Sequence, residues 1–181
     1  MSGLTKIKPP KKARIGLYSA GLNTYWGQFE GLYDCLMGYN RFIEKRLSEW
    51  GEVFNFGMVD TEKKGREAGE FFNKNNVDIV FSHAATYYAS ATVLPVHQIN
   101  NAPVIILNLQ PTAEMAYDTT GTDRWLAQCV GCSIPEISNA FNRAGITFRA
   151  VNGLLGLTET PDFAKADEVT CERPEAVRAW K

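Results

Sequence analysis

Short apolar runs alternate along this chain with longer stretches in which apolar residues recur every three or four positions. The short runs predict β-strands and the periodic stretches predict helices. The predicted strands cover residues 13–19, 53–58, 77–82, 103–107 and 146–151, and the predicted helices cover residues 29–47, 61–72, 91–99, 123–132 and 134–143. This alternation predicts an α/β protein, built as a three-layer, doubly wound parallel sheet of about five strands in a flavodoxin-like (Rossmann-like) order.

The two ends of the chain differ from this pattern. Residues 1–13 read as a flexible, solvated basic tail that leads to the first strand, and a nucleic-acid-binding arm is the less favoured interpretation. Residues 14–153 form the predicted Rossmann-like domain. Residues 154–181 read as a linker and the start of a helix, which stops after about two turns. We therefore expect a fragment of a longer protein, with a natural C-terminal helix that packs and frays as the alternative.

Charge and hydropathy limit the classes of partner. The sequence has 19 Lys and Arg residues against 20 Asp and Glu residues, a formal charge of −1. A charge so close to zero does not attract nucleic acid or anionic lipid. The sequence also lacks an apolar stretch of membrane-spanning length and the apolar middle of a secretory signal. We expect a cytoplasmic protein with a small-molecule partner, and neither nucleic acid nor a membrane as a partner.

Loops rich in amide, hydroxyl and aromatic side chains follow three of the predicted strands, at residues 23–26, 83–88 and 108–117. Ligands of open parallel sheets bind beyond the carboxyl ends of the strands. In the first loop, Tyr25 and Trp26 can stack on the apolar face of a sugar ring while Asn23 binds its hydroxyls, although aromatic residues at such positions are core residues about as often. The loops predict a site for a small, polar, uncharged ligand such as a sugar.

The histidines and cysteines of the sequence do not complete the patterns that metal or redox sites require. His83 can either bind a substrate hydroxyl or serve as a structural imidazole, and His97 has no second ligand one helical turn away. We therefore expect no complete metal site. Cys129 and Cys132 have the spacing of a redox or zinc pair, but they fall inside a predicted helix, which favours free thiols in a chain without a disulfide framework.

Seven short segments, taken in order, are similar to segments of a known family. They are IGLY (15–18), GLNTYWGQF (21–29), VDT (59–61), AATY (84–87), VLP (93–95), LNLQPT (107–112) and NRAGI (142–146). Together they resemble the N-terminal domain of L-arabinose isomerase-like proteins, of the L-fucose and L-arabinose isomerase superfamily, over roughly residues 14–153.

The resemblance implies a ketol isomerase that interconverts an aldose and a ketose with a divalent metal, usually manganese. In such enzymes the metal ligands lie in later domains, and the N-terminal domain contributes substrate contacts to a neighbouring subunit. The resemblance thus implies a homo-oligomer, no catalytic residues in these 181 residues, and an inactive fragment. The substrate contacts that it implies are Asn23, Tyr25, Trp26, Tyr87 and Gln128. Histidines that the family carries near two of these positions are absent here, which leaves the sugar open.

Two other classes of function remain open from the sequence. One is a sugar-binding or sensing domain without catalysis, which shares the doubly wound architecture and the polar loops. The other is an oligomerisation or interaction domain, whose exposed aromatic residues would form an interface.

Overall fold

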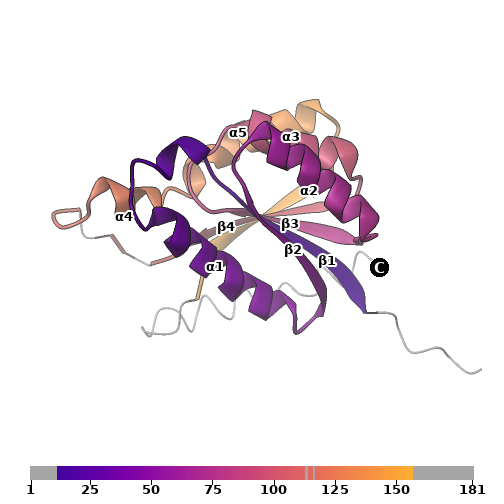
Figure 1. The fold of residues 1–181 in the computed structure, drawn as a ribbon, viewed down its shortest axis with the longest axis horizontal. Coiled ribbons are helices and arrows are strands. Elements are labelled where there is room, and N and C mark those ends of the chain that lie inside the picture. Colours follow the sequence, from indigo (N-terminus) through magenta and orange to yellow (C-terminus); the bar gives the residue numbers. More distant parts are fainter. Residues whose placement is uncertain (1–11, 113, 116, 157–181) are drawn as a thin grey trace, which may run out of the picture.

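A parallel sheet of five strands forms the centre of the protein in a computed structural model (Figure 1). The structure describes residues 12–112, 114–115 and 117–156. The strands are β1 (Ala13–Ala20), β2 (Gly51–Val59), β3 (Ile79–Ala84), β4 (Val104–Gln110) and β5 (Phe148–Leu154). They lie in the order β2-β1-β3-β4-β5, and each neighbouring pair is parallel. This is the flavodoxin-like order, so the predicted fold class is confirmed.

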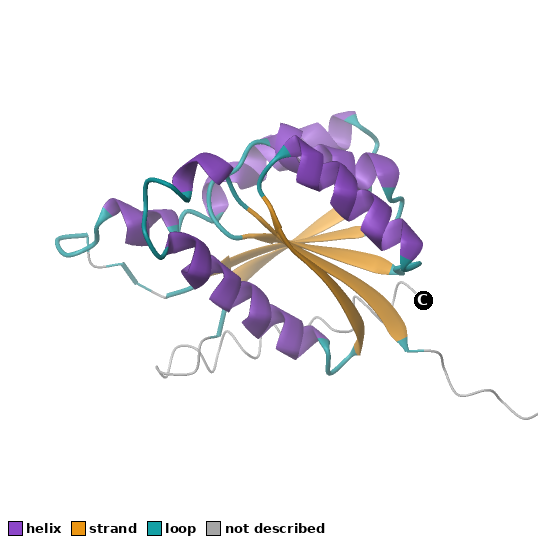
Figure 2. Cartoon of the chain, viewed as in Figure 1, coloured by secondary structure: helices purple, strands orange, loops and turns teal. Residues whose placement is uncertain are grey.

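Helices cover both faces of the sheet and complete the three layers (Figures 1 and 2). The helices are α1 (Leu32–Leu47), α2 (Glu62–Lys74), α3 (Ser90–Ile99), α4 (Thr122–Leu126) and α5 (Ile134–Arg143). Helix α1 packs on one face through Ile43, and α2, α3 and α5 pack on the other through Phe72, Val96 and Phe141. The short α4 lies beyond the end of the sheet, near the start of α1.

Strand β4 has the pattern expected of a central strand that is covered on both faces. Val104 and Ile106 belong to the core beneath α2, α3 and α5, whereas Ile105 and Leu107 belong to the core beneath α1. All four side chains are buried. Strands covered by helices on both sides are continuous apolar runs, and this is why residues 103–107 predict a strand.

Local signals set several boundaries of the elements. Thr61 precedes α2 and caps it, because its side chain accepts a hydrogen bond from the backbone N–H of Lys64 at 3.2 Å. The predicted helix over residues 123–132 is broken, because α4 ends at Leu126 and only a 3₁₀ turn at Gly131–Ser133 precedes α5. The predicted C-terminal helix and almost all of the basic tail lie outside the described residues.

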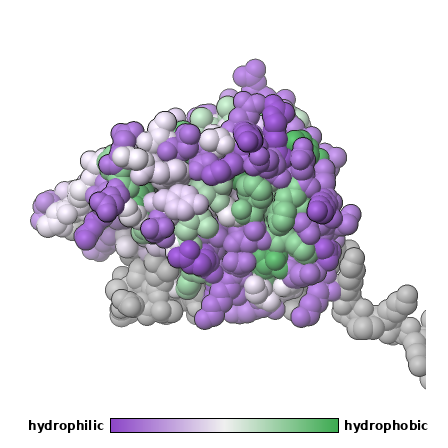
Figure 3. Space-filling view, viewed as in Figure 1, coloured by the Kyte–Doolittle hydropathy of each residue, from purple (hydrophilic) through white to green (hydrophobic). Residues whose placement is uncertain are grey.

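Strand β2 forms one edge of the sheet and, like the other edge strand β5, is less buried than the three strands between them. Most of its residues are partly exposed, Phe54 and Phe56 among them. Figure 3 shows hydrophobic side chains at the surface between α1 and α2, where this edge lies, surrounded by hydrophilic ones. None of the helices in the described part of the chain is long and apolar enough to cross a lipid bilayer.

Candidate ligand-binding site

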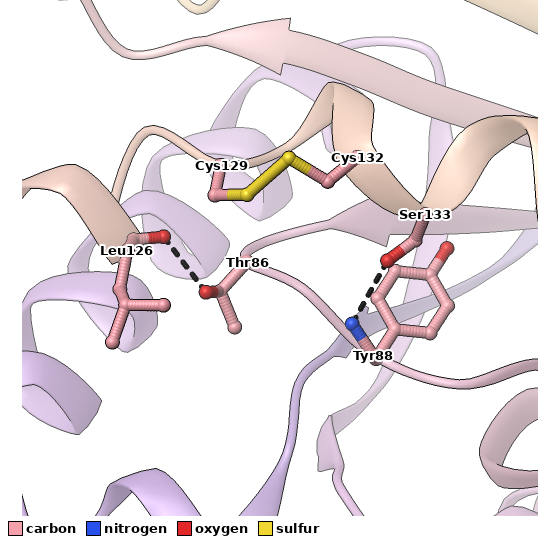
Figure 4. The surroundings of a disulfide bond; sticks show 6 residues. All are labelled: Thr86, Tyr88, Leu126, Cys129, Cys132 and Ser133. Atoms are coloured by element: carbon pink, nitrogen blue, oxygen red, sulfur yellow. Dashed lines mark hydrogen bonds between the residues drawn. A yellow bond between two sulfur atoms is a disulfide. The ribbon is translucent and has the colours of Figure 1, made fainter.

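The three polar loops do lie together at the carboxyl edge of the sheet. The backbone N–H of Ala85, after β3, donates to the carbonyl oxygen of Ala20 at the end of β1, at a normal hydrogen-bond distance of 3.2 Å. The hydroxyl of Thr86 donates to the carbonyl oxygen of Leu126 in α4 at 2.7 Å (Figure 4). These two hydrogen bonds join the end of β1, the loop after β3 and the segment that follows the loop after β4.

Tyr25 and Tyr87 bring two phenol rings to this edge from different loops. Tyr25 is half-buried, with its ring centroid 6.1 Å from that of Phe29, and Tyr87 is exposed. Burial raises the pKa of Tyr25, and the neighbouring phenol of Tyr87 raises it further. The phenol of Tyr25 is therefore neutral at physiological pH, as an ordinary phenol also is.

Trp26 anchors the first loop to the end of β2. Its indole N–H donates to Oδ2 of Asp60 at 2.7 Å, and the buried carboxylate of Asp60 also pairs with Lys64 at 2.8 Å. The indole ring lies against Gly21 so closely that a Cβ atom at Gly21 would come within 2.9 Å of it. The polar atom of Trp26 is therefore occupied, and a ligand could contact only its ring.

Two amide side chains supply polar groups at the same edge. The hydroxyl of Thr112 donates to Oε1 of Gln128 at 2.6 Å, which links the loop after β4 to the turn after α4. Gln128 is half-buried, and its Nε2 group has no acceptor among the described residues. Asn23 is exposed in the first loop, where its backbone N–H bonds to the carbonyl oxygen of Asp60 at 3.4 Å.

An apolar cluster beneath these groups explains why they meet. Its buried members come from α1, β2, the loop after β3 and the end of α4: Leu32, Leu36, Met58, Ala85, Leu126 and Ala127. Tyr25 and Trp26 pack against this cluster. Burial of this apolar surface holds the first loop against α4, and Gln128 follows directly on Ala127. All five predicted contact residues thus lie at one edge of the sheet, while their role in binding stays a prediction.

His83 is a structural residue, which decides between the two roles that the sequence left open. Its Nδ1 atom lies 2.8 Å from the hydroxyl of Ser19, and both side chains are buried. Burial lowers the pKa of His83 to about 3, so the imidazole is neutral. Asn40 donates to the same hydroxyl at 2.9 Å. A serine beside a histidine can form a nucleophile, but this hydroxyl is closed to any substrate.

His97 is buried on the opposite face of the sheet, where its Nε2 atom lies 2.9 Å from the hydroxyl of Tyr18. Burial also lowers the pKa of His97 to about 3. Within residues 12–112, 114–115 and 117–156, no three His, Cys, Asp or Glu side chains gather closely enough to hold a metal ion. This finding does not test the manganese ion that the resemblance implied, because its ligands were expected in later domains.

Cys129 and Cys132 form a disulfide, which corrects the prediction of free thiols (Figure 4). The prediction assumed one helix over residues 123–132, but α4 ends at Leu126 and the chain turns. The turn brings the two Cα atoms to 5.8 Å, which is within the usual range for a disulfide. The spacing of Cys129 and Cys132 was therefore a better guide to their pairing than the predicted helix was.

Two cavities lie away from the carboxyl edge. One, of about 500 Å³, lies at the amino ends of β4 and β5 and is lined by residues that include His97, Asn100, Asn101 and Thr147. Another, of about 390 Å³, lies between α3 and α5. Neither includes a predicted contact residue. We place the candidate site at the carboxyl edge because the convergent aromatic and amide side chains are there.

Comparison with known proteins gives little similarity. No protein-family model matches the sequence, and no curated protein matches it. The chain is similar in structure to a protein from Bacteroides fragilis that is provisionally named an acylhydrolase. The TM-score is 0.46 and the sequence identity 12%, over 95% of this chain and 92% of that one. A similarity of this size does not transfer a function.

The resemblance to L-arabinose isomerase-like proteins is wrong. No family model matches the sequence, that of these isomerases included, and no curated protein matches it. The physical reason lies in the segments themselves. Apolar runs that end in Gly, Asn or Thr are what any doubly wound sheet needs where a strand turns into a loop. The ketol isomerase reaction rested on this resemblance alone, so it is withdrawn as well.

Proposed function

We propose that the carboxyl edge of the sheet binds a small, uncharged, polyhydroxylated molecule, with a monosaccharide as the model ligand. The observation that carries this proposal is that the loops bearing Tyr25, Tyr87 and Gln128 meet at the carboxyl ends of the strands. Thr86, next to Tyr87, bonds to Leu126, and Tyr25 packs on the apolar cluster that contains Leu126. Sites of this kind combine apolar rings with a few polar groups that fix the orientation of the ligand.

The chemistry of these side chains suits hydroxyl groups and C–H faces. A phenol ring packs against the apolar face of a sugar, and its hydroxyl can donate or accept a hydrogen bond. Gln128 offers two N–H donors on Nε2, while its Oε1 atom already accepts from Thr112 and has a second lone pair. Asn23 adds an exposed amide on the facing loop. These groups are neutral, which favours a neutral ligand over a phosphate or carboxylate.

We propose that the described residues bind this ligand and do not catalyse a reaction on it. Both histidines are buried and neutral, and the hydroxyl of Ser19 is enclosed. The carboxylate of Asp60 is held by Trp26 and Lys64. A general acid, a base or a nucleophile has to reach the ligand, and these groups do not.

Titration of the protein with a panel of pentoses and hexoses, followed by NMR chemical shifts, tests the proposal. Sugars that bind should shift the signals of residues 23–26, 85–88 and 126–128. Loss of one hydrogen bond or one stacked ring typically removes about 1 kcal/mol. Gln128→Ala and Tyr87→Ala should therefore each weaken binding roughly fivefold.

Gln98→Ala is the matched control, because Gln98 is an exposed amide in α3 on another side of the protein. This variant should bind like the parent protein. Shifts confined to the 500 Å³ cavity around His97, or equal affinities for Gln128→Ala and Gln98→Ala, would contradict the assignment of the site.

The exposed aromatic residues at this edge favour a second function, association with another protein chain. Tyr33, Tyr87 and Trp125 are each more than a third exposed, and Tyr117 is 77% exposed. Exposed aromatic side chains are enriched at interfaces between protein chains. Sedimentation velocity over a hundredfold range of concentration tests this role, since Tyr87→Ala and Trp125→Ala should then reduce self-association.

A further inference from the structure

The disulfide between Cys129 and Cys132 lies in the turn between α4 and α5, and its two residues differ in their exposure to solvent. Cys132 is exposed, whereas Cys129 is only 5% exposed. We propose that this pair is a thiol–disulfide exchange site, in which Cys132 is the sulfur that exchanges with an external thiol and Cys129 is the resolving cysteine. This role is independent of the proposed ligand site.

Solvent access determines which sulfur an external thiol can attack. A thiolate has to approach a disulfide sulfur directly, so exposure of one partner selects the position of attack. Cys132 also lies two residues before α5, a helix of ten residues that begins at Ile134. The positive end of a helix dipole favours an anionic sulfur nearby. The carboxylate of Glu136, in the first turn of α5, is engaged by the backbone N–H of Ser90 at 2.7 Å.

The disulfide contributes little as a structural link. It closes a loop of only four residues, and short loops restrict the unfolded chain less than long ones. Two other hydrogen bonds already hold this segment on both sides of the disulfide (Figure 4). Thr86 donates to the carbonyl oxygen of Leu126 at 2.7 Å, and the backbone N–H of Tyr88 donates to the hydroxyl of Ser133 at 2.8 Å. Neither hydrogen bond involves the disulfide, so we expect the segment to stay in place when the disulfide opens.

The exchange balances with a dithiol, or with two molecules of a monothiol, as the reductant. The thiolate of the reductant attacks Sγ of Cys132 and forms a mixed disulfide, while the bond to Cys129 breaks and its sulfur leaves as a thiolate that takes a proton from water. A second thiolate then attacks the external sulfur of the mixed disulfide and releases Cys132 as a thiol. Two electrons pass from the reductant, which becomes a disulfide, to the pair.

The test uses glutathione as the probe and the full chain in which Cys35→Ser and Cys171→Ser remove the other two cysteines. Cys35 carries an exposed free thiol that would otherwise react with every reagent. Folded protein is equilibrated with mixtures of reduced and oxidised glutathione, alkylated and analysed by mass spectrometry. We expect the pair to interconvert between the disulfide and two thiols across these mixtures.

Single variants in the same background identify the exchanging sulfur. With oxidised glutathione, Cys129→Ser should form a mixed disulfide on Cys132 at least tenfold faster than Cys132→Ser forms one on Cys129. Circular dichroism checks that both variants are folded, and Cys129→Ala replaces Cys129→Ser if the serine is not tolerated. A pair that stays in one state in all the mixtures, or equal rates of adduct formation in the two variants, would overturn the proposal.

Discussion

The hydroxyl of Ser19 lies 2.8 Å from Nδ1 of His83, in a chain of hydrogen bonds that crosses the layer between the sheet and α1. Asn40 of α1 donates to this hydroxyl, and Asn55 of β2 donates both to Oδ1 of Asn40 at 2.6 Å and to Glu44 at 2.9 Å. Burial of polar groups is tolerated when each of them has a partner. The imidazole is therefore held neutral inside a satisfied network.

The two buried histidines predict a loss of stability in mild acid. Burial lowers the pKa of both His83 and His97 from 6.5 to about 3. Between these values the unfolded chain binds protons that the folded protein does not, so the stability is fully present above pH 6.5 and falls as the pH decreases towards 3. Each histidine should contribute about 1.4 kcal/mol per pH unit within this window.

Urea unfolding at several pH values between 7 and 5 measures this dependence. We expect the free energy of unfolding to fall by roughly 1.5–2 kcal/mol per histidine from pH 6.5 to pH 5. His83→Gln removes one titrating group, so the variant should lose about half of the slope even if it is less stable at pH 7. A stability that stays constant over this range would show that the histidines are accessible to protons in the folded state.

Removal of Asn40 should break the same network. Asn40→Ala leaves the hydroxyl of Ser19 and the amide of Asn55 each without one buried partner. Loss of a partner for a buried polar group costs about 1–3 kcal/mol. The control is Asn139→Ala, an exposed position in α5 where the change should remain within about 0.5 kcal/mol. Equal midpoints of unfolding in urea for the two variants would contradict the role of Asn40.

The hydrogen bond from Trp26 to Asp60 predicts a second loss of stability. Trp26→Phe keeps an aromatic ring but removes the N–H that donates to the buried carboxylate, which is then held by Lys64 alone. Hydrogen bonds to charged groups contribute about 1.5–3 kcal/mol. We expect a loss near the lower end of that range in urea unfolding. Trp125→Phe, at a position that is 43% exposed, should change the stability little.

The sequence predicted the architecture because its signal is periodic and repeated. The continuous apolar run of β4 and the three-to-four spacing of α1 each follow from burial on particular faces, so they determine the element type before any contact is known. The position of the loops then follows from the parallel order of the strands, because their carboxyl ends share one edge. This is why Tyr25, Tyr87 and Gln128 lie at the same edge.

Other features depend on contacts between distant residues and were not predicted. The sequence does not reveal that the N–H of Trp26 is occupied by Asp60, 34 residues away. The disulfide was missed because the breaking of a helix after Leu126 depends on how α4 packs against the loop after β3. The family resemblance failed because short segments at the ends of strands are common to doubly wound sheets in general and do not identify a family.

Close packing between α2 and α3 gives a last prediction, since it depends on a glycine. Gly65 of α2 is buried, and a Cβ atom at this position would collide with the backbone carbonyl oxygen of Thr92 in α3. A backbone atom cannot move aside as a flexible side chain can, so Gly65→Ala should push the two helices apart. Overpacking of this kind costs about 1–3 kcal/mol.

Gly38→Ala is the matched control within α1. There the nearest atom to an added Cβ is a guanidinium nitrogen of Arg41, 3.9 Å away at the end of a flexible side chain. Alanine restricts the unfolded chain more than glycine does, so this variant should gain about 0.4–1 kcal/mol. Thermal unfolding of both variants should therefore show shifts of opposite sign. A stabilised Gly65→Ala variant would mean that α2 and α3 are not packed as closely as their backbones indicate.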